Sequence, residues 1–155
     1  MIAEGLLELW WPDHVGQLFL ESVACMGTAV VCGAIVGYER EQKHKPAGFR
    51  THILVCLGAA AFVHLGVVAQ RLDVLSKGVT DFNRLIQSVA TGIGFLGAGA
   101  IFRARDRVRG VTTAASIWIM GAIGCAAGAG ALAYAFLLSL FGYAVLRWLL
   151  RLEQS

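Results

Sequence analysis

The chain has 155 residues, of which 57% are hydrophobic and 15% are charged, and its formal net charge is +3. Soluble domains average about 25% charged residues, so this composition, with a mean hydropathy of +0.69, favours a membrane protein over a soluble one. One domain, residues 1–155, accounts for the length. The first Lys or Arg is Arg40. Because a secretory signal peptide begins with a basic region, we expect no cleaved leader here.

Hydrophobic segments in chain order predict an all-α membrane protein with five transmembrane helices and glycine-rich packing. Residues 2–11 combine apolar side chains with two tryptophans and are too short to span a bilayer, so we expect a short N-terminal interfacial helix. The predicted spans are residues 15–38, 50–69, 85–102, 111–127 and 130–147. Two basic loops are expected between them, residues 39–50 after the first span and a tight loop of residues 103–109 after the third. The stretch 111–146 carries no charge and would measure roughly 54 Å as one helix, so it is divided into two spans by a turn at Gly128–Gly130.

The basic residues gather on one side of these spans. If the N-terminus lies outside, ten Lys and Arg residues flank the cytoplasmic helix ends and three flank the outer ends. The ten are Arg40, Lys43, Lys45, Arg50, Arg103, Arg105, Arg107, Arg109, Arg147 and Arg151, and the three are Arg71, Lys77 and Arg84. The positive-inside rule therefore predicts an N-out, C-in orientation. The four cysteines all lie in apolar runs, so we expect small buried hydrophobes and not disulfides.

The spacing of the glycines is a further pattern in the sequence. The stretch GIGFLGAG, from Gly92 to Gly99, formally matches the dinucleotide-binding pattern GxGxxG. That site needs a strand before it and a helix after it, whereas both flanks here belong to one apolar helical segment. Close helix packing is the favoured interpretation, and a thin helix beside a ligand or pore is the alternative. The expected packing glycines are Gly33, Gly37, Gly92, Gly94, Gly97, Gly99, Gly124 and Gly128.

A polar network is expected at the basic face. Its members are Glu39, Arg40, Glu41, Lys45, Arg50, Thr51, Arg103, Thr112 and Thr113, which end or open helices on that side. It either anchors the helices at the interface or forms a gate or docking surface whose ion pairs rearrange. Glu39 and Glu41 could hold Mg²⁺, although hard cations need more oxygen ligands than two side chains supply, so we expect no cofactor. On the third span, Asp81, Arg84 and Gln87 begin a polar stripe that must face protein or water.

Few polar side chains lie inside the spans. Glu21 is a candidate functional acid within the membrane, or an acid that reaches the nearby outer interface. His52, Cys56 and His64 share one helical face, but the histidines are roughly 18 Å apart along the helix axis. They cannot all hold one metal ion, so core packing is favoured. The sequence has no catalytic signature, and we expect no enzyme.

Three blocks resemble the MgtC/SapB family of bacterial inner-membrane proteins. They are GYEREQKHKPAGFRTHILVCLGAAAF (37–62), DFNRLIQSVATGIGFLGAGAIFR (81–103) and VRGVTTAASIWIMGAIGCAAGAG (108–130). The family motif residues correspond to Glu39, Arg40, Glu41, Lys45, Pro46, Gly48, Arg50 and Thr51, then Arg84, Gln87, Gly92, Gly94, Phe95, Gly97, Gly99 and Arg103, then Gly110, Thr112, Thr113, Ala114, Ala115 and Trp118.

This resemblance implies a multi-pass protein of the bacterial inner (cytoplasmic) membrane, linked to magnesium limitation and to virulence through intracellular survival. Some members are associated with restraint of the F-type ATP synthase. Many continue into a soluble ACT-like domain, which residues 1–155 do not include. Our first hypothesis is a non-enzymatic regulator that acts by helix contact in the lipid bilayer, as a homodimer, on a membrane partner such as that synthase, with no nucleic acid partner. The alternatives are a small ion (Mg²⁺ or proton) channel or transporter, and an assembly subunit of a larger complex.

Overall fold

A computed structural model describes residues 13–71, 82–104 and 107–152 of the chain. In these residues the fold consists of five helices and one short hairpin, so the predicted helical class is confirmed. The elements are α2 (Asp13–Gln42), α3 (Phe49–Arg71), α4 (Phe82–Gly99), β1 (Phe102–Ala104), β2 (Arg107–Arg109), α5 (Val111–Gly128) and α6 (Leu132–Leu152). Three of the helices are long and apolar enough to cross a membrane, namely α2 from Gly16, α3 and α5.

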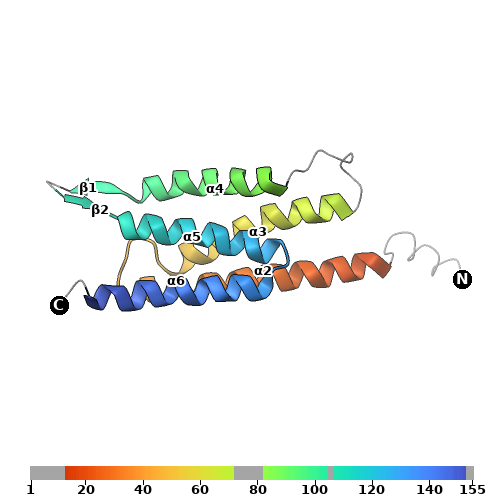
Figure 1. The fold of residues 1–155 in the computed structure, drawn as a ribbon, viewed down its shortest axis with the longest axis horizontal. Coiled ribbons are helices and arrows are strands. Elements are labelled where there is room, and N and C mark those ends of the chain that lie inside the picture. The colour runs from red at the N-terminus through yellow and green to blue at the C-terminus, as the bar shows by residue number, and fades with distance from the viewer. Residues whose placement is uncertain (1–12, 72–81, 105–106, 153–155) are drawn as a thin grey trace, which may run out of the picture.

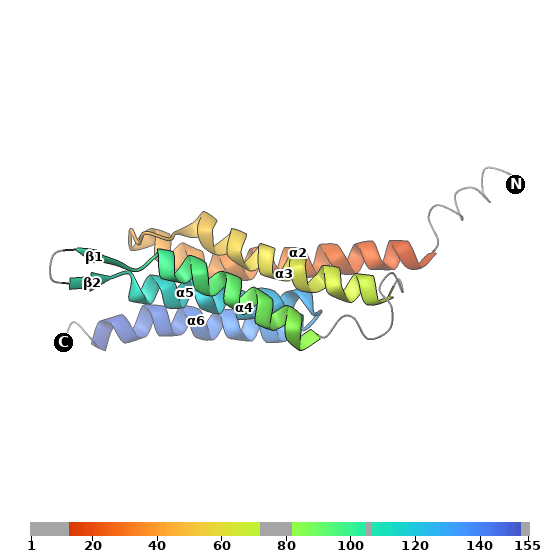
Figure 2. The ribbon, with the colours of Figure 1, turned by 90° about the horizontal axis from the view of Figure 1, so that it is seen from above.

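The helices form an elongated bundle in which successive helices run in opposite directions (Figures 1 and 2). Helix α5 lies at its centre and packs against α2, α3, α4 and α6. Helix α4 lies on the outside of the bundle, against α5 and, less extensively, α3. The end of α2, the β1–β2 hairpin and the end of α6 lie at one end of the bundle, here called the hairpin end. The start of α4 and the α5–α6 turn lie at the other, here called the turn end.

Glycines set the distance between the central helices. A Cβ added at Gly33 of α2 would lie 2.8 Å from the Cα of Ile53 on α3, and one added at Gly37 would lie 2.9 Å from the Cα of Phe49. On α5, a Cβ at Gly124 would lie 2.6 Å from the Ala59 side chain. These positions admit no side chain because helix backbones approach each other there, as small residues permit in membranes.

The glycines of α4 differ. A Cβ added at Gly92, Gly94 or Gly99 would meet nothing within 4 Å, and one at Gly97 would make an ordinary contact with Ala114 at 3.5 Å. The helix packing predicted for the first three is therefore not made within the described part of the chain. Glycines thus serve close packing in α5, whereas three of the four glycines in α4 lie open.

The helix boundaries correct three expectations. Helix α2 continues to Gln42, beyond the predicted end at residue 38, because the first helix-breaking residue comes later, at Pro46. Helix α4 ends at Gly99 and not at residue 102. The basic segment after it, predicted as a tight loop, is an antiparallel hairpin in which Phe102 pairs with Arg109 and Arg103 with Val108.

Glycines with positive φ lie at two of the boundaries between elements. Gly110 has φ +91° and separates the hairpin from α5, and a Cβ there would collide with the Ala100 carbonyl. The predicted turn between the last two spans is confirmed, with Gly130 at φ +83°, a conformation that glycine adopts without steric penalty. The interfacial helix predicted for residues 2–11 lies outside the described residues.

Candidate functional site

A buried charge cluster lies at the C-terminal end of α2. Glu39 and Arg40 are each 1% exposed. Arg40 Nε donates to Glu39 Oε2 at 2.5 Å, and Lys43 Nζ lies 2.8 Å from Glu39 Oε1. Among the described residues, Arg40 Nη2 is buried without a hydrogen-bond acceptor. Buried charges need partners to offset lost hydration, so these two cations are held by one carboxylate inside the hairpin end.

Glu41 follows Arg40 in the sequence but makes a different contact. Its Oε2 accepts a hydrogen bond at 2.9 Å from the backbone N–H of Phe49, the first residue of α3. A carboxylate at this position satisfies a free helix donor and favours the positive end of the helix dipole. Glu39 and Glu41 thus engage different partners and do not converge on a cation. In the described ranges there is no group of three or more His, Cys, Asp or Glu side chains placed to hold a metal ion.

The rest of the predicted network is dispersed. Lys45, Arg50, Thr51 and Thr112 are exposed, and Thr113 is buried. Arg103 belongs to β1, and its side chain and the whole of Asp81 lie outside what the structure describes. The ion pairs that the structure records at the hairpin end join Glu39 to Arg40 and Lys43, so the two basic loops are not linked to each other by ion pairs among the described residues.

Two histidines of α3 pair with serines of the neighbouring helices α2 and α5. His52 Nδ1 faces the Gly48 carbonyl at 2.9 Å, and its Nε2 faces Ser116 Oγ on α5 at 3.0 Å. His64 Nδ1 faces the Gly128 carbonyl of α5 at 3.1 Å, and its Nε2 faces Ser22 Oγ on α2 at 2.8 Å. Both histidines are buried, and these hydrogen bonds satisfy polar groups that the core encloses.

These pairs do not form a nucleophile–base arrangement. In a catalytic triad the histidine Nδ1–H donates a hydrogen bond to a carboxylate, and preorganised N–H donors bind the oxyanion that forms during the reaction. Here Nδ1 faces a backbone carbonyl in each pair. Both serines lie inside helices, where backbone N–H groups already bond within the helix. The observed role of the pairs is to join α3 to α2 and α5.

A polar cavity of ≈ 340 Å³ lies at the turn end, between α2, α3 and the α5–α6 turn. Glu21, Cys25, His64 and Arg71 line it together with backbone of Gly128 to Gly130. Glu21 pairs with Arg71, the last residue of α3. Glu21, a candidate from the sequence, thus lies beside a cation, and its carboxylate is about half exposed.

The outer face of α4 carries the predicted polar stripe. Arg84, Gln87 and Thr91 are all exposed. The Thr91 hydroxyl donates to the carbonyl of Gln87 at 2.8 Å, so the hydroxyl is satisfied within the helix. Phe95, one turn further, is 81% exposed. This face combines polar side chains, open glycines and a bare aromatic ring, and the described helices leave it uncovered.

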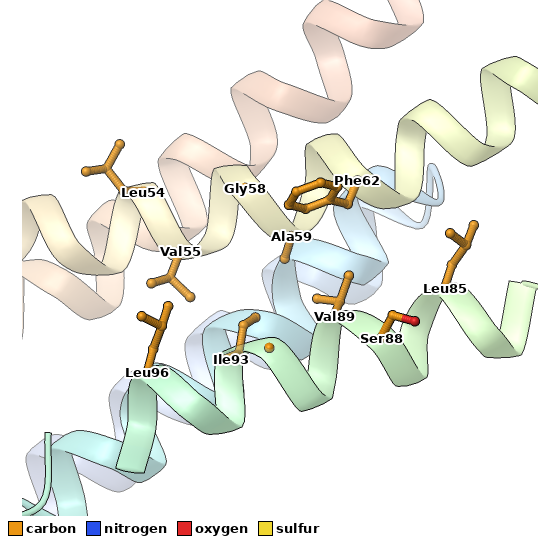
Figure 3. A pocket seen from close by; sticks show the side chains of 11 residues that line it. Leu54, Val55, Gly58, Ala59, Phe62, Leu85, Ser88, Val89, Ile93 and Leu96 are labelled. Carbon is orange, nitrogen blue, oxygen red and sulfur yellow. The ribbon is translucent and has the colours of Figure 1, made fainter. Parts of the chain in front are cut away.

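Beside it, an apolar groove of ≈ 490 Å³ separates α4 from α3 (Figure 3). Gly58 and Phe62 from α3 and Val89, Gly92 and Leu96 from α4 are among its lining residues. Ser88 is the one lining residue with a polar side chain, and its hydroxyl donates to the Arg84 carbonyl. The groove follows from the two open glycines, since a Cβ at Gly58 or Gly92 would meet nothing within 4 Å.

Comparison with known proteins identifies the family of this chain. The MgtC family model matches residues 26–155. The chain belongs to the MgtC family. Protein MgtC of Brucella abortus (strain 2308) is 39% identical over 124 residues, which cover 80% of this chain and 49% of that protein. Protein SrpB of Synechococcus elongatus is 41% identical over 110 residues, which cover 66% of this chain and 60% of that protein.

YhiD of Escherichia coli (strain K12) is 43% identical over 104 residues, which cover 66% of this chain and 47% of YhiD. The chain spans about half the length of the curated relatives it matches. No solved structure matches it. The MgtC family match confirms the resemblance read from the three sequence blocks, and with the three candidate spans it makes this chain an MgtC family membrane protein.

Sequence reasoning missed Lys43 and the two serine partners. Lys43 follows Glu39 by four residues, a spacing at which helical side chains meet, so this partner could have been found. Ser22 and Ser116 lie 42 and 64 residues from their histidines, and no local pattern joins residues at such separations.

Proposed function

We propose that this chain is a non-enzymatic protein of the bacterial inner membrane, with five spans and an N-out, C-in orientation. The alternating helix directions support an odd number of crossings. The placement of Arg40, Lys43, Arg107 and Arg109 at the hairpin end supports a cytoplasmic location for that end. Helices α4 and α6 would cross as part of the bundle, although they lie outside the three long candidate spans.

The chain acts by helix contact on a membrane partner, and the observation that carries this proposal is the uncovered face of α4. In lipid the hydrophobic effect does not drive helices together, so association depends on close packing at small residues and on polar contacts. The α4 face offers both, since Gly92, Gly94 and Gly99 have open space beside them and Arg84 and Gln87 are exposed.

A second copy of the chain occupies this face, and the two copies form a homodimer. The family resemblance supplies the regulated partner, a membrane complex such as the F-type ATP synthase, and the setting of low magnesium and intracellular survival.

The dimer is tested by native mass spectrometry and cross-linking in mild detergent or nanodiscs. Gly94→Leu places a side chain in open space, so it leaves the monomer folded and blocks the α4 face. Gly27→Leu is the matched control, because Gly27 on α2 is also exposed and open. We expect dimers for the unsubstituted protein and for Gly27→Leu, and monomers for Gly94→Leu. Monomers throughout, or equal dimerisation of both variants, would reject the proposal.

A second candidate function is a small Mg²⁺ or proton channel or transporter. The polar stripe on α4 and the cavity beside Glu21 favour it, and the name of YhiD proposes magnesium transport for that relative. Liposome flux assays distinguish the two functions. Flux above that of empty liposomes, lost in Arg84→Ala or Glu21→Gln, supports transport, and flux equal to that of empty liposomes eliminates it.

A further inference from the structure

The cavity at the turn end holds a hydrogen-bond chain that lacks one proton when His64 is neutral. The chain runs from the Gly128 carbonyl to His64 Nδ1, from His64 Nε2 to Ser22 Oγ, and from Ser22 Oγ to the Leu18 carbonyl. Its three contacts measure 3.1, 2.8 and 2.7 Å. Each contact is short enough for a hydrogen bond, and each hydrogen bond needs a hydrogen between its two heavy atoms.

The two carbonyls at the ends can only accept. The Gly128 carbonyl therefore requires a hydrogen on Nδ1, which leaves Nε2 of a neutral imidazole as an acceptor. The Ser22 hydroxyl has one hydrogen and faces two acceptors, Nε2 and the Leu18 carbonyl. A neutral His64 thus fills two of the three contacts. A protonated His64 fills all three, because Nε2–H donates to Ser22 Oγ and the hydroxyl turns to the Leu18 carbonyl.

We infer that His64, with Ser22 and the Gly128 carbonyl, forms a proton-binding site that opens on the cavity between α2, α3 and the α5–α6 turn. Water in the cavity delivers the proton, because His64 lines the cavity wall. No bond other than N–H is made or broken. The bound proton links α2, α3 and α5 at the turn end, since two of the three filled contacts join His64 of α3 to Ser22 of α2 and to the Gly128 carbonyl of α5.

The other ionisable groups around the cavity are compatible with a cationic His64. Helix α2 contributes Glu21 and Cys25, α3 contributes Arg71, and the lining residues of the α5–α6 turn carry no ionisable side chain. The Arg71 charge is already matched by Glu21, so the lining other than His64 is close to neutral. The site thus accepts one positive charge without a second uncompensated cation beside it.

His52 is an internal control within the same helix. Its Nδ1 and Nε2 also face a carbonyl and a serine, and Ser116 Oγ likewise faces a carbonyl, that of Thr113, at 2.8 Å. Its side chain is 0% exposed, and the opposite charges of Arg40 and Glu39 both lie within electrostatic reach of it. Neither of the described cavities includes it. We therefore expect His52 to stay neutral where His64 becomes charged, although both have the same hydrogen-bond pattern.

The experiment is ¹⁵N NMR of the histidine side chains in the full chain in nanodiscs, from about pH 8 to about pH 5, the range in which an ordinary histidine gains its proton. Single His→Gln variants assign the resonances. At the upper pH we expect His64 as the tautomer protonated at Nδ1. On acidification we expect imidazolium shifts at His64 and none at His52.

Ser22→Ala removes the hydroxyl, and at a given pH it should lower the imidazolium-to-imidazole ratio of His64 roughly tenfold, the effect of losing one hydrogen bond to a charged group. Ser22→Thr keeps a hydroxyl and should restore the ratio. Ser139→Ala is the matched control, because this buried serine bonds the Cys32 carbonyl and no histidine. It should change nothing at His64.

Three results would overturn the inference: a neutral His64 throughout, an Nε2–H tautomer at high pH, or a His64 titration unchanged in Ser22→Ala. Titration of His52 alongside His64 would contradict the role of the cavity. If Ser22→Ala fails to fold, Ser22→Thr and the tautomer of the unsubstituted protein still decide. The measurement needs no partner or dimer, so its outcome is independent of the proposed function.

Discussion

Replacing Gly124 with alanine tests the packing of the central helix α5. The added Cβ would lie 2.6 Å from the Ala59 Cβ and would also collide with the Cys56 carbonyl. The Cys56 carbonyl belongs to the α3 backbone and the Ala59 Cβ is bonded to that backbone, so neither group can rotate away. The helices must separate, or α5 must shift.

The expected magnitude combines two opposing effects. Inserting an extra methyl into a packed core costs about 1–3 kcal/mol, and this site lies at the upper end because backbone must move. Alanine regains about 1 kcal/mol of helix propensity over glycine. The net loss is about 2 kcal/mol, and in a chain of this size it lowers the midpoint of thermal unfolding by roughly 4–8 °C.

Two open glycines supply the controls. Gly27→Ala on α2 and Gly58→Ala on α3 add the same methyl where nothing lies within 4 Å, so the propensity gain acts alone. We expect unchanged or slightly higher midpoints, by up to about 1 kcal/mol in stability. Thermal unfolding in one detergent, followed by circular dichroism, compares the three variants. Equal midpoints for Gly124→Ala and Gly27→Ala would refute the packing of α5 against α3.

Glu39→Gln leaves the Arg40 guanidinium buried without its counter-charge, and we expect a loss of about 3–5 kcal/mol in the same unfolding assay; a loss below about 1 kcal/mol would mean that this cluster is hydrated. Glu21→Gln breaks the ion pair with Arg71, but both side chains are about half exposed, so we expect a change below about 1 kcal/mol, and a larger one would place the pair in a drier setting. Cys32 is a free thiol with 0% exposure; we expect maleimide to modify it only after unfolding, and labelling of the folded protein at the rate of an exposed thiol would contradict its burial.

The helices could be predicted because the hydropathy and the length of an apolar segment can both be read from the local sequence. The turn at Gly130 was also predictable, since an uncharged run of that length cannot cross the bilayer once. The β1–β2 hairpin was not predicted because its arginines suggested a solvated loop. Phe102 and Val108, residue types that favour strands, were the available signal, and Gly110 marks the end of the hairpin.

The candidate site was less predictable than the fold. Gly124 and Gly92 occur in similar small-residue patterns, yet one lies against α3 and the other lies open. The difference depends on which helices are neighbours, and the sequence of one helix does not contain that information. The same holds for His64, whose partners Ser22 and Gly128 come from two other helices. The shared face of His52 and His64 was visible in the sequence, but not the serines that it meets.

Helices α4 and α5 have the same length, 18 residues, and both are rich in glycine. Helix α5 is surrounded by four other helices. The α3 backbone fills the space beside Gly124 and Gly128, and the Ile93 side chain of α4 fills the space beside Gly121. Helix α4 keeps Arg84 and Gln87 on an open face. In lipid, exposed polar side chains raise the free energy and open glycines forgo packing contacts. Both terms would fall if another helix covered that face, which is the contact that the proposed dimer makes.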